Sequence, residues 1–415
     1  MPENFGKTTN YQNLSLLHRY LYTCLYLVIT EGYITQGKNH FSYNYKMLIQ
    51  NYFKVPKDKD MLDIFKPLYL WLTILGLFPY NIKLTKNKKE YVIIKNSIFF
   101  NFACAVLFLT VLVVYFVVHV KDLFLPHNMR DAFITKLNYV TELSTFLIFC
   151  AVGYFCTFLY RTEHVKILNS ITTTFRELPN SDSSIMKQLY FHVNIVTGVV
   201  AFVLFLQIAV NFTRTDGLWK TVLVAITFNL AQMLQVSLLG LYYVMILMIA
   251  ASLLNVRNHV EKLGITNTFI SPLSNEYKLP KTTVTLHQIE MTYGRILETK
   301  LIINKMFQAP LLVATIQCFH SMVSECHTVY HMVVVTREFS AHLIFNCLIW
   351  VVYQVGKIAA MASSGYLLNI RIEHFASMVT IQKVDITVYE LFPIDSTLFY
   401  NVSFLAYYSN ILNFI

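Results

Sequence analysis

The stretch AYYSNILNF, Ala406 to Phe414, closes a hydrophobic span that begins near Ile394 and stops one residue before the last residue of the chain, Ile415. A span of this length can cross the hydrocarbon core of a bilayer as a helix, which takes about 20 residues. Because no charged tail follows it, such a helix is expected to end at a membrane face. A pore could open at that position.

The composition is typical of a membrane protein, since 55% of the 415 residues are hydrophobic and only 13% are charged. The backbone finds no water to bond inside a bilayer, so long apolar spans are expected to be helices; barrel strands are shorter and alternate. We therefore predict an all-α, polytopic membrane protein with seven transmembrane helices. The predicted spans are 97–120, 137–160, 190–212, 223–253, 303–330, 341–361 and 394–415.

Basic residues concentrate in alternate loops. Loops rich in Lys and Arg stay cytoplasmic, so the pattern predicts a cytoplasmic N-terminus and an extracellular C-terminus. This orientation is the reverse of a G-protein-coupled receptor and argues against that class. The predicted cytoplasmic side carries Lys83, Lys86, Lys88, Lys89, Lys95, Arg161, Lys166, Arg176, Lys187, Arg257, Lys262, Lys278, Lys281, Arg295, Lys300, Arg371 and Lys383, and the other side Lys121, Arg130, Lys136, Arg214, Lys220 and Arg337.

Residues 1–96 are expected to form a cytoplasmic N-terminal region. Within it, PLYLWLTILGLFPYN (67–81) is bounded by prolines and carries a Trp and a Tyr, residue types that favour the membrane interface. It predicts a short interfacial or re-entrant helix. The fourth and fifth spans exceed the bilayer thickness and are joined by a predicted loop from Leu254 to Ile303. Excess helix length must tilt or project, which predicts a cytoplasmic bundle where subunits could associate.

Few residues suggest catalysis. Glu142 and Glu325 lie near predicted outer ends of spans, where exposure to water explains them, and no Asp or Lys at motif spacing pairs with either. No P-loop, GxSxG, HExxH or dinucleotide motif occurs. We therefore expect no enzyme, no cofactor, no metal site and no nucleic-acid partner. A polar cavity lining is the preferred reading of the four histidines near the outer halves of spans five and six, His320, His327, His331 and His342.

Polar residues at apolar depth are more informative. In lipid they either bond neighbouring helices or, beside aromatic residues, line a small-molecule pocket. The sequence places both types within spans three to six, which predicts a ligand pocket in the outer half of the bundle. The candidate ligand-binding residues are Phe202, Phe205, Gln207, Phe228, Asn229, Gln232, Gln317, His320, Phe345, Asn346 and Trp350; Gln235 and Gln354 lie at similar depth.

The closing stretch resembles the signature of the insect gustatory receptors, TYhhhhhQF, in which h is hydrophobic. Tyr407, Asn413 and Phe414 fall on its Tyr, Gln and Phe positions, whereas Ala406 replaces the Thr. Three further stretches are similar to family patterns in the expected order. They are the 67–81 stretch, LIINKMFQAPLL (301–312) and FASMVTIQKVDITVYELFPID (375–395).

The resemblance implies a tetrameric cation channel that is opened directly by a ligand and is similar in fold to insect odorant receptors. It implies transmembrane helices one to six within 97–362, a cytoplasmic anchor segment at 363–393 forming the first half of helix seven, and a pore-lining second half at 394–415. Tyr407 would lie in the pore helix, and Asn413 and Phe414 at the outer gate. A ring of Phe side chains can close a pore by dewetting.

The function expected from the resemblance is a tastant-gated, nonselective cation channel in the plasma membrane of a sensory neuron. The family's sugar receptors usually carry Glu after the motif Tyr, and Tyr408 stands there. A bitter or other plant-derived compound is therefore the expected ligand. The expected assembly is a homotetramer, or a heteromer with other receptors, surrounded by lipid. The alternatives are an odorant receptor subunit that needs a co-receptor, and a metabotropic receptor or transporter; a transporter usually carries a paired intramembrane charge.

Overall fold

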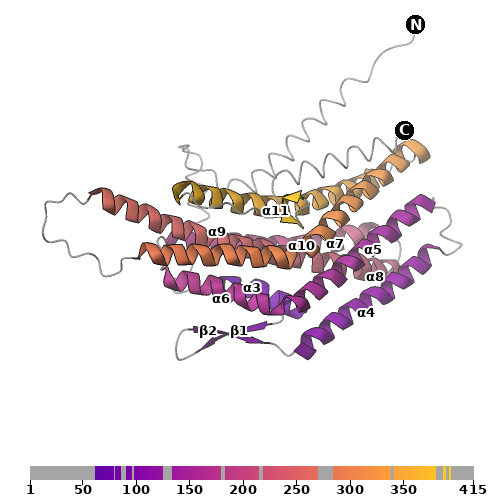
Figure 1. Ribbon diagram of the computed structural model, residues 1–415. Helices are drawn as coiled ribbons and strands as arrows, with labels where there is room; N and C mark the ends of the chain where they lie inside the picture. Colours follow the sequence, from indigo (N-terminus) through magenta and orange to yellow (C-terminus); the bar gives the residue numbers. More distant parts are fainter. Residues whose placement is uncertain are drawn as a thin grey trace, which may run out of the picture. The chain divides into compact units, whose positions relative to one another are not determined.

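A computed structural model of the chain divides into two units, Met1–Lys54 and Val55–Ile415. The residues that the structure describes all belong to the second unit (Figure 1). They are residues 61–78, 80–85, 90–95, 98–124, 133–178, 183–214, 218–269, 284–337, 341–379, 387–388 and 392–393.

Long helices coincide with the first six predicted spans. Five of the described helical stretches are long and apolar enough to cross a membrane: Phe102–Lys121, Lys136–Leu159, Val222–Lys262, Leu286–Val335 and Leu343–Glu373. Helix α7 coincides with the remaining span, 190–212. The seventh predicted span lies outside the described residues. The helices are α4 (Ile98–Leu123), α5 (Phe133–Leu159), α7 (Ser183–Arg214), α8 (Leu218–Val224), the π-helix η2 (Ala225–Leu230), α9 (Ala231–Phe269), α10 (Leu286–Tyr330), the π-helix η3 (His331–Thr336) and α11 (Ala341–Val379).

The prediction of a loop from Leu254 to Ile303 is wrong, because most of that segment is helical. Helix α9 continues to Phe269 and α10 already begins at Leu286, where Thr285 and Gln288 form a capping box. The early turns of α10 bury Ile289, Tyr293 and Ile296, spaced as one face of a helix. The length of an apolar run identifies only the part of a helix that could lie in hydrocarbon. It therefore does not predict these amphipathic extensions of α9 and α10.

Helix α11 likewise runs past the predicted end of the sixth span. It continues without a break from Ala341 to Val379, through the first part of the segment predicted as a cytoplasmic anchor. Beyond it the structure describes two short strands, β3 (Thr387–Val388) and β4 (Phe392–Pro393), which pair antiparallel.

The 67–81 stretch also differs from its prediction. The helix there, α3, spans Met61–Ile74 and contains Pro67, so this proline does not bound it. From Tyr80 the chain forms an antiparallel hairpin of β1 (Tyr80–Thr85) and β2 (Glu90–Lys95). Short strands of this kind are a minor departure from an all-α fold. Helix α3 packs on α7 and α9, and its residues Ile64, Phe65, Leu68, Tyr69 and Leu72 are buried.

Helix α9 is the central element of the bundle, and α4 is the most peripheral. In the apolar window of α9 83% of residues are buried, against 17% in that of α4. The α9 side chains from Val244 to Ile249 are all buried. An all-round apolar helix of this kind belongs inside a bundle. Helices α9 and α10 run side by side in Figure 1 and contact one another.

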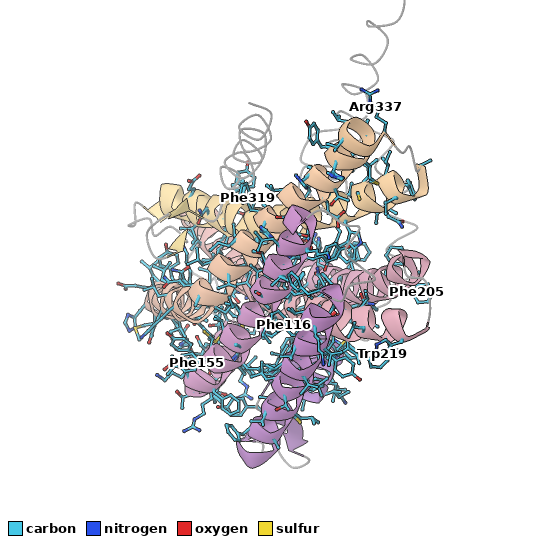
Figure 2. The ribbon with its side chains drawn as sticks, turned by 90° about the vertical axis from the view of Figure 1, so that its right-hand side faces the viewer. Phe116, Phe155, Phe205, Trp219, Phe319 and Arg337 are labelled. Atoms are coloured by element: carbon cyan, nitrogen blue, oxygen red, sulfur yellow. The ribbon has the colours of Figure 1, made fainter. Side chains whose placement is uncertain are left out.

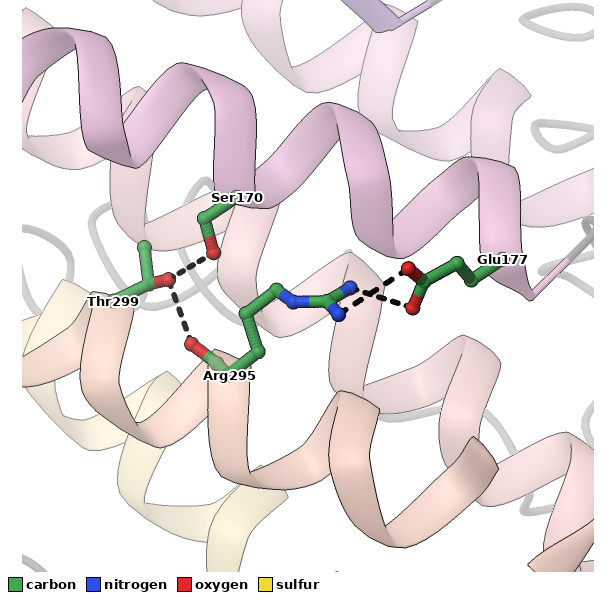
Figure 3. Close-up of polar contacts among 4 residues, drawn as sticks. All are labelled: Ser170, Glu177, Arg295 and Thr299. Carbon is green, nitrogen blue, oxygen red and sulfur yellow. Dashed lines mark hydrogen bonds and ion pairs between the residues drawn. The ribbon is translucent and has the colours of Figure 1, made fainter. Parts of the chain in front are cut away.

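Polar contacts hold α10 to α6 (Arg161–Glu177), the one described long helix whose sequence is not apolar overall (Figure 3). The guanidinium of Arg295 donates to both carboxylate oxygens of Glu177, at 2.7 and 3.3 Å. The hydroxyl of Thr299 donates to the Arg295 carbonyl at 2.7 Å, which leaves its oxygen to accept from Ser170 at 2.5 Å. Both charged groups are partly exposed, so this ion pair contributes little to stability and mainly orients α6 and α10 relative to each other.

A glycine ends α3 in a conformation that other residues disfavour. Gly76 has φ +71°, and a Cβ placed there would lie 3.0 Å from the Cβ of Cys104. The turn is held by the Tyr154 hydroxyl, which donates to the Leu75 carbonyl at 2.8 Å, and by Trp71, whose indole N–H donates to Ser237 at 3.0 Å. The Cβ atom of any other residue would strain this turn.

We expect Gly76→Ala to lower the free energy of unfolding by about 1–2 kcal/mol, from the left-handed conformation alone. Thermal unfolding of the purified protein in detergent measures the change. Gly198→Ala is the matched control, because a Cβ on that residue of α7 meets no atom within 4 Å. It should leave stability unchanged or slightly raise it, since Ala favours helix. Equal stability of both variants would contradict the strain argument.

Candidate functional site

The polar residues predicted at apolar depth gather around a lysine of α11. The ammonium nitrogen of Lys357 donates to the side-chain oxygens of Gln235 at 2.7 Å, Gln317 at 3.1 Å and Gln232 at 3.2 Å. Nε2 of Gln235 also donates to the Gln317 oxygen at 3.0 Å. Lys357 is 6% exposed and the three glutamines are 0% exposed. A buried ammonium is stable only when its N–H groups have such acceptors.

Helical spacing explains why these residues meet. Gln232 and Gln235 lie three residues apart on α9 and so share one face of that helix. Trp350, Gln354 and Lys357 follow each other on α11 at intervals of four and three residues, which also makes one face. Because α9, α10 and α11 contact each other pairwise, these faces meet inside the bundle.

A carboxylate completes the cluster from α5. The Ser321 hydroxyl of α10 donates to Glu142 Oε1 at 2.6 Å, and Nε2 of Gln354 donates to the Ser321 oxygen at 3.0 Å. The negative charge of Glu142 also acts electrostatically on the Lys357 ammonium. The network therefore joins α5, α9, α10 and α11, and it contains one group of each charge. We call its members, Glu142, Gln232, Gln235, Gln317, Ser321, Gln354 and Lys357, the buried polar network.

One expectation about charge is wrong. Glu142 and Glu325 are each only 7% exposed, so exposure to water does not explain either acid. The sequence shows no Lys at motif spacing from either acid, but the structure brings Lys357, near the middle of the apolar stretch Leu343–Glu373, close enough for its ammonium to feel the charge of Glu142. The sequence did carry a signal for this residue, since a Lys within a predicted span is by itself a marker of function.

Aromatic side chains enclose the ammonium. The ring of Tyr353 has its centroid 4.7 Å from the Lys357 nitrogen, and the ring of Phe146 lies at 5.9 Å. Both distances are within the range of cation–π attraction. The Tyr353 hydroxyl donates to the Gln232 oxygen at 2.9 Å, and the Tyr353 ring meets Trp350 edge-on at 5.7 Å. The site therefore combines hydrogen-bonding groups with apolar ring surfaces.

A second aromatic group surrounds Phe228, on the π-helical turn η2. Its ring makes edge contacts with His119, Phe146 and Tyr139, at centroid distances of 6.0, 6.0 and 6.2 Å. Nδ1 of His119 lies 3.1 Å from the Thr227 hydroxyl and fixes α4 to the same turn. Single π-helical turns are frequent at functional sites. Since Phe146 also contacts Lys357, this group adjoins the buried polar network.

Three predicted aromatic residues lie elsewhere. Phe205 of α7 is 72% exposed and lies at the edge of the bundle (Figure 2), and Phe202 and Phe345 are also exposed. In the described part of the chain they do not contribute to the buried cluster. The position of these residues within a predicted span indicates their depth but not the rotation of each helix about its axis.

The remaining candidates have mixed positions. Asn229, Asn346 and Trp350 are buried, and His320 is half-buried, with Nε2 at 3.4 Å from the Asn138 carbonyl. The side chain of Gln207 is not among the described ones. Tyr407, Asn413 and Phe414, the predicted pore and gate residues, lie outside the described residues, so their roles stay predictions.

Comparisons with known proteins agree with this architecture. The family model of the 7tm chemosensory receptors matches residues 65–368. The solved structure of the insect olfactory receptor OR5 from Machilis hrabei is similar in fold, with a TM-score of 0.59 and 10% sequence identity over 85% of this chain and 97% of that one. No curated protein sequence matches the chain significantly. The likeness in fold confirms the all-α, polytopic prediction, apart from the short strands, but not the orientation of the termini. The family match confirms the resemblance found in the sequence, and the chain belongs to the 7tm chemosensory receptors of insects.

Proposed function

We propose that this chemosensory receptor is a gustatory receptor that acts as a tastant-gated, nonselective cation channel for bitter or other plant-derived compounds. The observation that carries the proposal is the enclosed cluster between α5, α9, α10 and α11, in which Tyr353, Phe146 and Trp350 adjoin the buried polar network. Apolar surface with a few convergent polar groups is the usual composition of a small-molecule site. A ligand there would contact four helices at once.

The proposal includes a plasma-membrane location in a sensory neuron and an assembly of four subunits, either identical or mixed with other receptors. In such an assembly, α11 is the element through which the ligand site would act, because it carries Lys357 and continues to Val379, toward the predicted pore segment. The odorant receptor alternative shares this fold and differs in needing a co-receptor to conduct.

One observation favours a different candidate function. Lys357 and Glu142 are oppositely charged groups within apolar helices and interact electrostatically, as in many transporters. In this second reading, the buried polar network would bind a transported molecule, and no ligand-gated conductance would exist.

Whole-cell current separates these functions. The full chain is expressed alone, G-protein signalling is blocked, and plant alkaloids, phenolics and sugars are applied. A rapid current that reverses near zero millivolts would support the channel. Uptake of a labelled compound without such a current would support the transporter. Current only with an added co-receptor would support the odorant receptor alternative.

We expect Phe414→Ala to raise the current that flows without ligand. A ring of four Phe side chains can close a pore by dewetting, and Ala is too small to do so. The measurement is resting current normalised to surface expression, with Phe205→Ala as a control on an exposed side chain. An unchanged resting current at equal surface expression would remove Phe414 from the gate.

A further inference from the structure

The hydrogen bonds of the buried polar network fix the orientation of its amide groups. An ammonium has three N–H donors and no acceptor. Lys357 directs them to three glutamine oxygens, so each of these side chains turns its oxygen to the lysine. The NH₂ of Gln235 is used by the Gln317 oxygen. The NH₂ groups of Gln232 and Gln317 are buried and have no partner within the described part of the chain.

The opposite charge fixes the remaining amide. An ionised carboxylate only accepts hydrogen bonds, so Ser321 donates to Glu142 and must accept from Gln354. The NH₂ of Gln354 therefore faces Ser321. Its oxygen is buried and, among the described residues, has no donor.

An indole lies on the same face of α11. Trp350 precedes Gln354 by four residues, so the two side chains are neighbours on the helix. Its N–H can only donate, and it too is buried without an acceptor in the described ranges. The buried polar network and Trp350 thus offer three open donors, from Gln232, Gln317 and Trp350, and one open acceptor, from Gln354. Leaving such groups unsatisfied is costly, and a bound molecule would satisfy them.

We propose that these four side chains are a subsite for a neutral molecule with a carbonyl oxygen beside an N–H group, namely a carboxamide or a lactam. The carbonyl oxygen accepts from the amide and indole donors, and the N–H donates to the Gln354 oxygen. A charged ligand fits less well, because Lys357 and Glu142 already balance each other and a further buried charge would be uncompensated. The rings of Tyr353 and Phe146 would contact an apolar or aromatic body. This inference rests on the proposed function, for which it names a ligand class.

Ligand binding tests the subsite without requiring a current. The purified full-length chain is unfolded thermally in detergent with benzamide, N,N-dimethylbenzamide or ethylbenzene at equal free concentration. A ligand that binds only the folded protein raises its stability in proportion to RT ln(1 + [L]/Kd). We expect the largest shift with benzamide, a smaller one with its dimethyl analogue, which lacks the N–H, and none with ethylbenzene.

Variants assign the effect to named atoms. Gln354→Met removes the acceptor and keeps the side-chain volume, so benzamide should bind about tenfold more weakly and lose its advantage over the dimethyl analogue. Trp350→Phe removes one donor and should weaken both amides. Thr315→Val is the matched control, because that buried hydroxyl of α10 donates to the Leu311 carbonyl of its own helix and to no other group among the described residues. It should leave all three shifts as in the wild type.

The ranking of the three probes on the wild-type chain carries the test even if a variant fails to fold. Equal shifts with all three would mean apolar binding only, and no shift with any would mean that the open groups bond water; either result would overturn the subsite. Benzamide binding without any ligand-gated current would support the subsite and count against the channel. Currents from ligands that lack a carbonyl, with no benzamide binding, would support the channel and count against the subsite.

Discussion

Lys357→Met should abolish accumulation of folded protein at the cell surface. The substitution keeps most of the side-chain volume and removes the donor that three buried glutamine oxygens share. It also removes the positive charge that acts on the buried Glu142 carboxylate. Leaving a buried acceptor such as the Gln235 oxygen without its donor costs about 1–3 kcal/mol, and the lost charge interaction adds to this cost, against the roughly 5–15 kcal/mol that stabilises a typical domain. Surface biotinylation and size-exclusion profiles of a tagged chain measure the loss.

Two further variants separate charge pairing from a general intolerance of substitution. Lys166→Met removes an exposed lysine of α6 whose pairing with Glu163 at 3.1 Å should contribute less than about 1 kcal/mol. It should express as the wild type. The double variant Lys357→Met with Glu142→Gln removes both charges, so it should recover part of the lost expression. Wild-type expression of Lys357→Met alone would show that the ammonium does not support the fold.

The length of the apolar spans predicts the helical fold. The prediction fails at helix ends and turns, whose positions do not depend on how deep a residue lies in the membrane. Helix α10 begins well before its predicted start because Ile289, Tyr293 and Ile296 bury only one face of it against the bundle. Helix α3 contains Pro67, although proline usually bounds a helix. The hairpin of β1 and β2 was not predicted. Its strands contain Lys83 and Lys95, which in the sequence indicate only the orientation of the chain in the membrane.

The candidate site shows the same division. Gln232 and Gln317 were predicted from their depth in the spans alone, and in the structure the side-chain oxygens of both accept a hydrogen bond from Lys357. Depth also selected Phe202 and Phe205, which are exposed, because the rotation of a helix about its axis decides what a residue meets. Lys357 could not be paired from the sequence, because the partners of an acid or a base inside a membrane come from other helices, far away in sequence.

Phe228→Ala should strongly destabilise the fold, unlike substitution of the exposed predicted ligand residues Phe202, Phe205 and Phe345. Phe228 is 7% exposed, and its ring contacts His119, Tyr139 and Phe146 from two other helices. Truncation of a buried Phe to Ala leaves a cavity and costs about 3–5 kcal/mol. Apolar transfer contributes less to helix association in lipid than in water, but the lost packing contacts remain. We therefore expect a lower apparent melting temperature in detergent.

Phe205→Ala provides the comparison, because it deletes the same side chain from a position that is 72% exposed. An exposed substitution of this kind usually changes stability by no more than about 0.5 kcal/mol. If the two variants melt at the same temperature, the rings around Phe228 do not support the fold. If Phe228→Ala alone is destabilised and a ligand raises its melting temperature by more than it raises that of the wild type, the ligand gains contacts in the space that the ring has left. Because Phe146 contacts both Phe228 and Lys357, such rescue would place that ligand next to the buried polar network.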